Sequence, residues 1–272
     1  MRLAVRHTTR YRFQQPVIHA LQRLHLTPKA TQGQEILSWS MDFKNATKQL
    51  EYEDQHFNTT TLVSVEPGAQ EVEISCTGLV DTHDFAGVIG KHAGHLPLWC
   101  FRGHTVLTRP GSQMDKLAKD IASQNLEPLP LLHALSEMVL SRMPYSKGTT
   151  AVGTTAEEAL VDENGVCQDH AQVFIGVARQ LGIPARYVSG YLMMDDRVEQ
   201  EATHAWAEAH VDGLGWVGFD ISNGISPDQR YVRVATGRDY RDAAPVTGIR
   251  FGANTEELEV EVSVRQQQQT QQ

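Results

Sequence analysis

Three residue types that cooperate in nucleophilic catalysis occur in separate segments of the second half of the chain. Cys167 follows an Asn-Gly pair in NGVCQDHAQVF, His204 lies in THAWAEAHV, and Asp220 lies in GWVGFDI. A thiol, an imidazole and a carboxylate can act as a nucleophile, as the base that exchanges its proton, and as the group that orients the base. The chemistry predicted for this set is nucleophilic catalysis by the thiol, assisted by the imidazole and the carboxylate.

The segment after Cys167 predicts a helix with the cysteine in its first turn. Apolar residues follow Cys167 at offsets of four, seven, eight, eleven and fourteen, which is one helical face, and Gly182 marks the far end. At the start of a helix the free amides and the dipole stabilise a thiolate, and the same amides can hold an oxyanion. A free cysteine is also a common small core residue, so its position alone does not decide whether Cys167 is catalytic or part of the core.

The histidine segment predicts a strand whose two faces differ. In THAWAEAHV small apolar residues share one face, while His204, Trp206, Glu208 and His210 share the other. The turn residues DGLG lead into GWVGFDI, which we expect to return antiparallel. A loop of three or five residues would place Asp220 beside or diagonal to His204, whereas a two-residue loop would turn it away.

If the loop has an odd number of residues, the thiol, the imidazole and the carboxylate can each be assigned a catalytic role. We expect Cys167 to attack the substrate, His204 to take the thiol proton and later give it to the leaving group, and Asp220 to fix the imidazole tautomer. Cys167 and a neighbouring N–H are the expected oxyanion donors.

Gln168, Trp206 and Glu208 are further candidates for the oxyanion or substrate site. Each also has a simpler interpretation. Gln168 is a solvated first-turn residue, Trp206 is an aromatic packed on a sheet, and Glu208 is the partner of a basic group such as Arg186.

A soft metal site formed by Cys167, His170, His204 and His210 is an alternative interpretation of the same region. The catalytic arrangement already accounts for the main positions, and the sequence has no second cysteine pair. We therefore expect no metal, nucleotide or other cofactor.

Patterning along the chain predicts an α+β protein. We expect an antiparallel β-rich domain over residues 1–85, then a catalytic domain with a helical lead-in over 86–265, and a disordered Gln-rich tail over 266–272. Helices are expected in PGSQMDKLAKDIAS, from the proline pair Pro128 and Pro130 to before Pro144, and over Ala156 to Val161, capped by Thr155.

Composition excludes several classes of function. The chain has 24 basic and 33 acidic residues, a net charge of -9, and no basic cluster, so nucleic acid is not an expected partner. No segment reads as a signal peptide or a bilayer span, which predicts a soluble, cytoplasmic protein without a membrane partner. Three widely separated cysteines predict no disulfide framework. Nothing in the pattern supports or excludes a homo-oligomer.

The segments around Cys167, His204 and Asp220 resemble the transglutaminase-like superfamily of papain-type cysteine enzymes, in its bacterial branch with an N-terminal β-domain. The resemblance rests on GVCQDHAQVFIGVARQLGIPARYVSGY, HAWAEAHVDGLGWVGFDISNG and GRDYRDAAPVTG, with TTRYRFQQPV and LQRLHLTPKATQ near the start. It implies a papain-like fold for the catalytic domain and a triad of Cys167, His204 and Asp220. Ile221 and Ser222 stand where the family commonly has a Pro-Thr pair.

The resemblance implies thioester chemistry on a peptide or protein amide and leaves the acceptor open. Water as acceptor gives a peptidase or amidase, which we favour, and an amine gives a transglutaminase. A binding or scaffold module that keeps the fold without turnover is the alternative of a different class. Members of that kind usually lose triad residues, whereas all three residue types are present in this chain.

Overall fold

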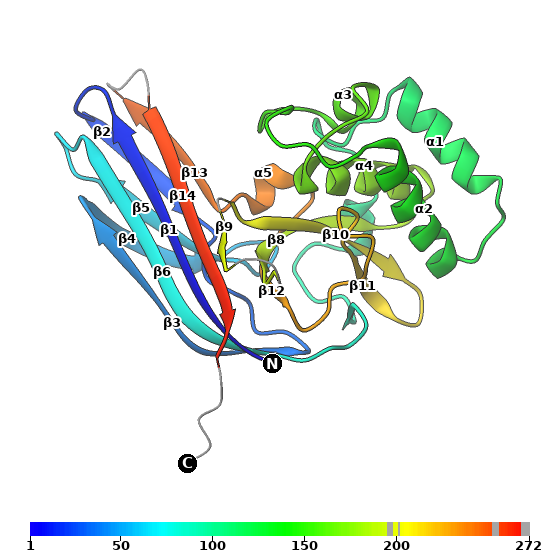
Figure 1. Ribbon diagram of the computed structural model, residues 1–272, viewed down its shortest axis with the longest axis horizontal. Coiled ribbons are helices and arrows are strands. Elements are labelled where there is room, and N and C mark those ends of the chain that lie inside the picture. The colour runs from blue at the N-terminus through cyan, green and yellow to red at the C-terminus, as the bar shows by residue number, and fades with distance from the viewer. Residues whose placement is uncertain (195–197, 201, 252–255, 268–272) are drawn as a thin grey trace, which may run out of the picture.

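The computed structural model describes residues 1–194, 198–200, 202–251 and 256–267. Long strands form one part of the molecule, and helices covering a smaller sheet form the other (Figure 1). All of the strand pairs are antiparallel. The prediction of an α+β protein is therefore confirmed.

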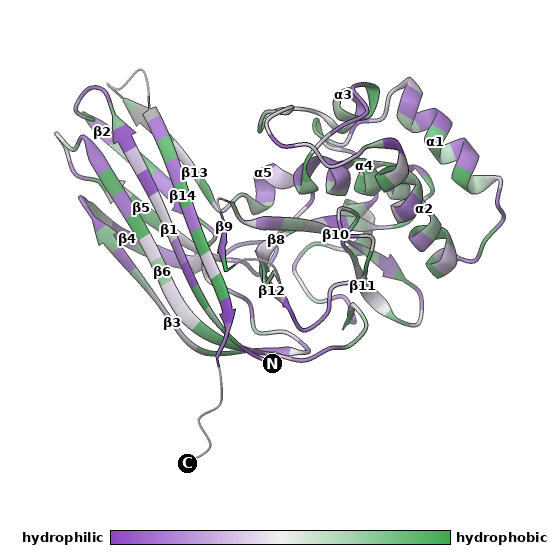
Figure 2. Cartoon of the chain, viewed as in Figure 1, coloured by the Kyte–Doolittle hydropathy of each residue, from purple (hydrophilic) through white to green (hydrophobic). Residues whose placement is uncertain are grey.

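Two sheets of the strand-rich part pack face to face as a sandwich. Their strand orders are β3-β6-β1-β14-β9 and β13-β2-β5-β4. The strands are β1 (Arg2–Phe13), β2 (His19–Leu24), β3 (Gln34–Lys44), β4 (Ala46–Glu53), β5 (Thr59–Val65), β6 (Glu71–Thr82), β9 (Glu199–Gln200), β13 (Val246–Phe251) and β14 (Glu256–Gln266). Hydrophilic and hydrophobic residues alternate along the long strands, as expected when only one face of each sheet is buried (Figure 2).

The chain returns to this sandwich at its C-terminal end. Strand β14 pairs with β1 along its length, from Leu3 opposite Gln266 to Phe13 opposite Glu256, and β13 pairs with β2. The division at residue 85 that the sequence pattern predicts does not include these strands, because alternation identifies a buried face but not the partner strand. In the tail expected at 266–272, Gln266 ends β14, and residues 268–272 lie outside the described residues.

The second part contains a sheet of order β12-β8-β10-β11-β7 and the helices. The strands are β7 (Val88–Gly90), β8 (Ala185–Leu192), β10 (His204–Val211), β11 (Gly215–Phe219) and β12 (Tyr231–Gly237). The helices are η1 (Leu98–Phe101), α1 (Ser112–Ala122), α2 (Pro128–Arg142), α3 (Ala156–Val161), α4 (Cys167–Gln180) and α5 (Tyr240–Ala243). None of the helices formed by the described residues has the length and apolar character needed to span a bilayer.

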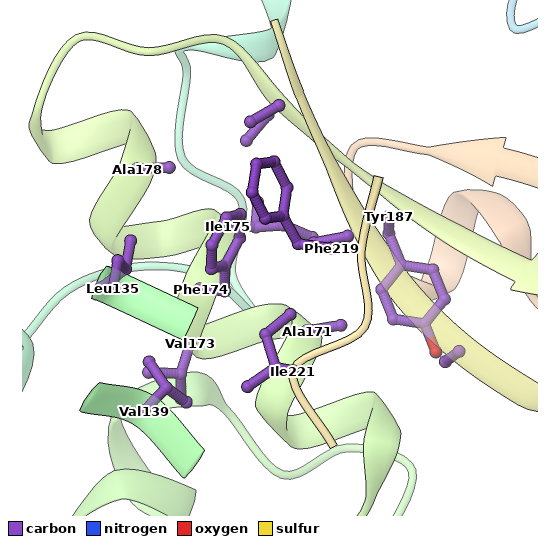
Figure 3. Close-up of a cluster of buried hydrophobic side chains, with 14 of the residues drawn as sticks. Leu135, Val139, Ala171, Val173, Phe174, Ile175, Ala178, Tyr187, Phe219 and Ile221 are labelled. Carbon is purple, nitrogen blue, oxygen red and sulfur yellow. The ribbon is translucent and has the colours of Figure 1, made fainter. Parts of the chain in front are cut away.

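Helix α4 is the element that anchors this part to its sheet. Its apolar face packs on the sheet, where the rings of Phe174 and Phe219 lie 5.1 Å apart (Figure 3). The helix ends where Gly182 adopts a φ of 79°, which lets the N–H of Ile183 bond to the carbonyl of Ala178 at 3.0 Å. The start and the end of α4 both follow the periodic pattern predicted from the sequence.

A buried ion network links the smaller sheet to the sandwich. The Glu208 carboxylate on β10 accepts hydrogen bonds from Arg186 Nε at 2.6 Å and Arg233 Nε at 2.7 Å. Burial raises the pKa of Glu208, but the two guanidinium groups outweigh it and lower the pKa to about 2. Gln34, at the start of β3, bonds to both the N–H and the carbonyl of Arg233, each at 2.7 Å. The strand that carries Arg233 is therefore bonded to Glu208 through its side chain and to the sandwich through its backbone.

Replacing Glu208 by glutamine should destabilise the protein strongly. The substitution keeps the shape but leaves two buried guanidinium groups without a counter-charge, and breaking a buried ion pair costs about 3–5 kcal/mol. The free energy of unfolding in urea measures this loss. Glu73→Gln, in a partly exposed pair with Arg10, is the matched control and should cost far less. Equal losses in the two variants would contradict the prediction.

Candidate active site

Cys167 is the first residue of α4, preceded by Val166 in an extended conformation. The carboxylate of Asp169, two residues into the helix, accepts a hydrogen bond from the Val166 N–H at 2.9 Å and one from the Thr150 hydroxyl at 2.7 Å. These bonds fix the backbone just before Cys167, whose side chain is half-buried. The first N–H groups of a helix have no partner inside it, so the sulfur lies beside free donors and the positive end of the dipole.

His204 and Asp220 meet through the register of two strands. Val211 pairs with Gly215, which leaves a three-residue loop, and Ala207 pairs with Phe219. Continuing this register places Asp220 diagonal to His204, as an odd loop length predicts. The His204 Nε2 atom lies 2.6 Å from Asp220 Oδ2. The imidazole is therefore oriented by a carboxylate on the neighbouring segment.

The charge of His204 is set by residues on both sides of its ring. Burial lowers the pKa of His204, but Asp220 and Cys167 together outweigh it and raise the pKa to about 10. Cys167 is one of the groups that raise the pKa of the imidazole, which places its side chain close to the ring. Because Nε2 is bonded to Asp220, Nδ1 is the ring nitrogen that remains for the sulfur. The structure thus brings Cys167, His204 and Asp220 together from three separate elements.

The Asp220 carboxylate has two further donors that the sequence analysis did not identify. Its Oδ2 atom accepts hydrogen bonds from Asn223 Nδ2 at 2.6 Å and from the Tyr231 hydroxyl at 2.7 Å. Burial raises the pKa of Asp220, but His204 and these donors lower it below its ordinary value. Asn223 lies in the turn that directly follows Asp220, so its role was accessible from local turn chemistry. Tyr231 reaches the site from β12, and no local pattern signals that contact.

Trp206 supports the imidazole by packing. It is only 2% exposed and lies in an apolar cluster with Val188, Leu192 and Tyr231. Its ring stacks on His204, with centroids 6.2 Å apart and planes at 30°. The structure therefore favours the packing interpretation of Trp206 over the oxyanion one.

Glu208 and Gln168, the other two candidates for the oxyanion or substrate site, lie in different surroundings. Glu208 is fully buried in the ion network, with its oxygens bonded to Arg186 and Arg233, rather than beside Cys167. The expectation that Glu208 lines the substrate site is corrected accordingly. Gln168 lies next to Cys167 on α4 and donates a long 3.4 Å hydrogen bond to the carbonyl of Val152. Gln168 therefore lies in the first turn of the helix, beside the segment that contains Val152.

Two of the four residues of the alternative metal site, His170 and His210, have other partners. Both ring nitrogens of His170 have hydrogen-bonding partners, Ser222 and Met143. His210 lies against Trp216, with ring centroids 5.5 Å apart. Within the ranges that the structure describes, no group of three or more His, Cys, Asp and Glu side chains is placed to hold a metal ion.

Surface hollows do not by themselves locate this chemistry. A hollow of about 960 Å³ lies on the sandwich, lined by side chains such as Arg6, Ser40 and Thr77. A smaller one of about 50 Å³ is lined by Trp206 and Tyr231, the residues that contact His204 and Asp220. The position of the thiol, imidazole and carboxylate defines the candidate active site better than the size of any hollow.

Comparison with known proteins identifies relatives over nearly the whole chain. The uncharacterized protein ML0607 of Mycobacterium leprae is 28% identical over 97% of this chain and 98% of its own length. The uncharacterized protein Rv2569c of Mycobacterium tuberculosis is also 28% identical, over 97% of this chain and 91% of its own length.

A solved structure shares the fold. The crystal structure of a "Putative Cysteine Protease" from Cytophaga hutchinsonii matches with a TM-score of 0.73 and 21% identity, over 97% of this chain and 98% of that one. At this level of identity the likeness concerns the fold alone.

Two family models match separate parts of the sequence. Residues 3–81 match the bacterial transglutaminase-like N-terminal region, which corresponds to strands of the sandwich. Residues 115–221 match the transglutaminase-like superfamily, and this range contains Cys167, His204 and Asp220. The chain therefore contains a core of the transglutaminase-like superfamily, preceded by the bacterial transglutaminase-like N-terminal region.

Proposed function

We propose that the protein is a cysteine-dependent enzyme that cleaves amide bonds of a peptide or protein through a thioester on Cys167. One arrangement carries the proposal. His204 is bonded to Asp220 at 2.6 Å, and its raised pKa depends in part on Cys167 at the start of α4. A buried carboxylate that keeps an imidazole charged beside a thiol is the arrangement that activates a cysteine nucleophile.

Acylation follows from the positions of these groups. The Cys167 sulfur attacks the carbonyl carbon of the substrate, a C–S bond forms, and the carbonyl electron pair moves onto the oxygen. The N–H groups at the start of α4 are the donors for this oxyanion. The C–N bond then breaks as the His204 imidazolium gives its proton to the leaving amine.

Deacylation runs through the same imidazole. Neutral His204 takes a proton from water, the resulting hydroxide attacks the thioester carbon, and the C–S bond breaks to release the acid. Cys167 leaves as a thiolate beside the charged imidazole, so the starting state returns. With an amine as acceptor, the same steps give a new amide, which is the transglutaminase reaction. We favour water, in keeping with the description of the Cytophaga hutchinsonii structure, which shares the fold, as a "Putative Cysteine Protease".

Iodoacetamide should label Cys167 at a pH below the range in which ordinary thiols ionise, about 8.5. The imidazolium of His204 stabilises the thiolate, so His204→Ala should slow labelling at pH 6 by at least about tenfold. Mass spectrometry of the labelled peptides from pH 5 to 9 measures both rates. Cys100, half-buried in η1, is the internal control and should not respond to the substitution. Slow labelling that ignores His204 would favour the non-catalytic binding module.

Replacing Asp220 by asparagine should lower the pKa of His204 from about 10 toward its ordinary value of 6.5. The amide oxygen can still accept the hydrogen bond, but the negative charge that stabilises the imidazolium is gone. The charged ring stabilises the fold fully below pH 6.5, and this contribution disappears as the pH rises to about 10. An NMR titration of the His204 ring protons measures the shift. Tyr231→Phe removes only one donor to Asp220 and should move the pKa less. An unchanged titration in Asp220→Asn would contradict the assignment.

The acceptor is decided by product analysis. Peptide amides incubated with the enzyme should give free acids, and an added primary amine should be incorporated more slowly than water, because we expect hydrolysis. Mass spectrometry distinguishes the products, and Cys167→Ala is the control that should form neither. Amine incorporation that exceeds acid formation would identify a transglutaminase instead.

A further inference from the structure

His170 is a buried histidine, three residues after Cys167 on α4, with both ring nitrogens engaged. Its Nε2 atom lies 2.7 Å from the carbonyl oxygen of Met143, at the end of α2. A carbonyl oxygen only accepts, so Nε2 carries the hydrogen, and Nδ1 accepts from the Ser222 hydroxyl at 2.8 Å. Burial lowers the pKa of His170, although Asp169 and Asp220 oppose the shift. The neutral ring therefore has one tautomer with two defined partners.

Ser222 belongs to the turn that carries Asp220. The Asp220 N–H bonds to the Ile225 carbonyl at 2.8 Å, and Ile225 returns a bond at 3.2 Å, so the turn is closed. Ile221 is 1% exposed and belongs to the same core cluster as Ala171 and Val173 of α4 (Figure 3). The turn is thus held to α4 by one apolar side chain and by the hydroxyl of the next residue.

We propose that the hydrogen bond from Ser222 to His170 is a positioning contact that sets the place of Cys167 relative to His204 and Asp220. This positioning role rests on the proposed function. His170 is three residues from Cys167, and Ser222 is two residues from Asp220. The chain leads from Cys167 along α4 to His170, which is hydrogen-bonded to Ser222 in the turn after Asp220. Asp220 is bonded to His204, and Cys167 raises the pKa of His204, so these links form a closed ring. A ring of short segments transmits small displacements of the turn directly to the thiol–imidazole pair.

The contact has a counterpart elsewhere in the molecule that serves as a control. His25, in the sandwich part, is 1% exposed, and its Nε2 atom lies 3.1 Å from the Thr60 hydroxyl. Its Nδ1 atom lies 3.2 Å from the carbonyl oxygen of Ala244. The two histidines therefore share the same kind of partners, but only His170 lies on the helix of Cys167.

The test compares Ser222→Ala, Ser222→Thr and Thr60→Val with the wild type. Each protein is labelled with iodoacetamide at Cys167 across pH 5 to 9, and its thermal midpoint is measured. Ser222→Ala should slow labelling at pH 6 by roughly five- to tenfold, the effect of losing about one hydrogen bond of 1–1.4 kcal/mol at the reacting pair. Ser222→Thr keeps the hydroxyl and should restore the rate. Thr60→Val should lower the thermal midpoint without changing the labelling profile.

The outcomes separate the two proposals. If the wild type labels fast at low pH and Ser222→Ala labels equally fast, the positioning role is wrong and the proposed function stands. A loss of labelling in Thr60→Val equal to that in Ser222→Ala also overturns the role, because the effect then follows stability alone. If the wild type labels slowly and His204→Ala changes nothing, the proposed function fails, and the positioning role fails with it.

Discussion

The candidate site depends on a carboxylate held away from water. Asp220 is fully buried, and a buried charge is tolerated only when it is paired and hydrogen-bonded. His204 supplies the pairing charge, and Asn223 and Tyr231 supply further donors. Each of these partners must then be placed by its own element. The pairing of β10 with β11, the turn after β11 and the first residue of β12 all meet at this one group.

The same constraint explains why the start of α4 must be fixed. An imidazolium paired with a carboxylate can stabilise a thiolate only if the sulfur stays beside it, so the start of α4 cannot drift. Asp169 holds the backbone before Cys167, and His170 connects the helix to the turn after Asp220. The core beneath, where Phe174 meets Phe219, resists movement of the helix against the sheet because close-packed interiors transmit strain.

The sandwich takes part in this arrangement through polar contacts and through the path of the chain. Glu208 lies four residues after His204 on β10, and its two arginine partners belong to the strands β8 and β12 that flank the site. Gln34 of the sandwich bonds to the backbone of Arg233. Strands β13 and β14 bring the end of the chain back to β2 and β1. The superfamily core is thus attached to its N-terminal region by polar contacts and by the path of the chain.

The sequence by itself determined the features that have a short-range signature. The apolar period after Cys167 specified α4 and put the thiol at its start. The turn residues DGLG predicted an antiparallel return but left the loop length open, and the three-residue loop of the structure is what brings Asp220 to His204. Only the tertiary structure decided which distant groups complete the site. Tyr231 reaches Asp220 from another strand, His170 finds Ser222 across 52 positions, and β14 pairs with β1 at the opposite end of the chain. Local periodicity reports which face of an element is buried, whereas the partner on that face is chosen by the packing of the whole chain.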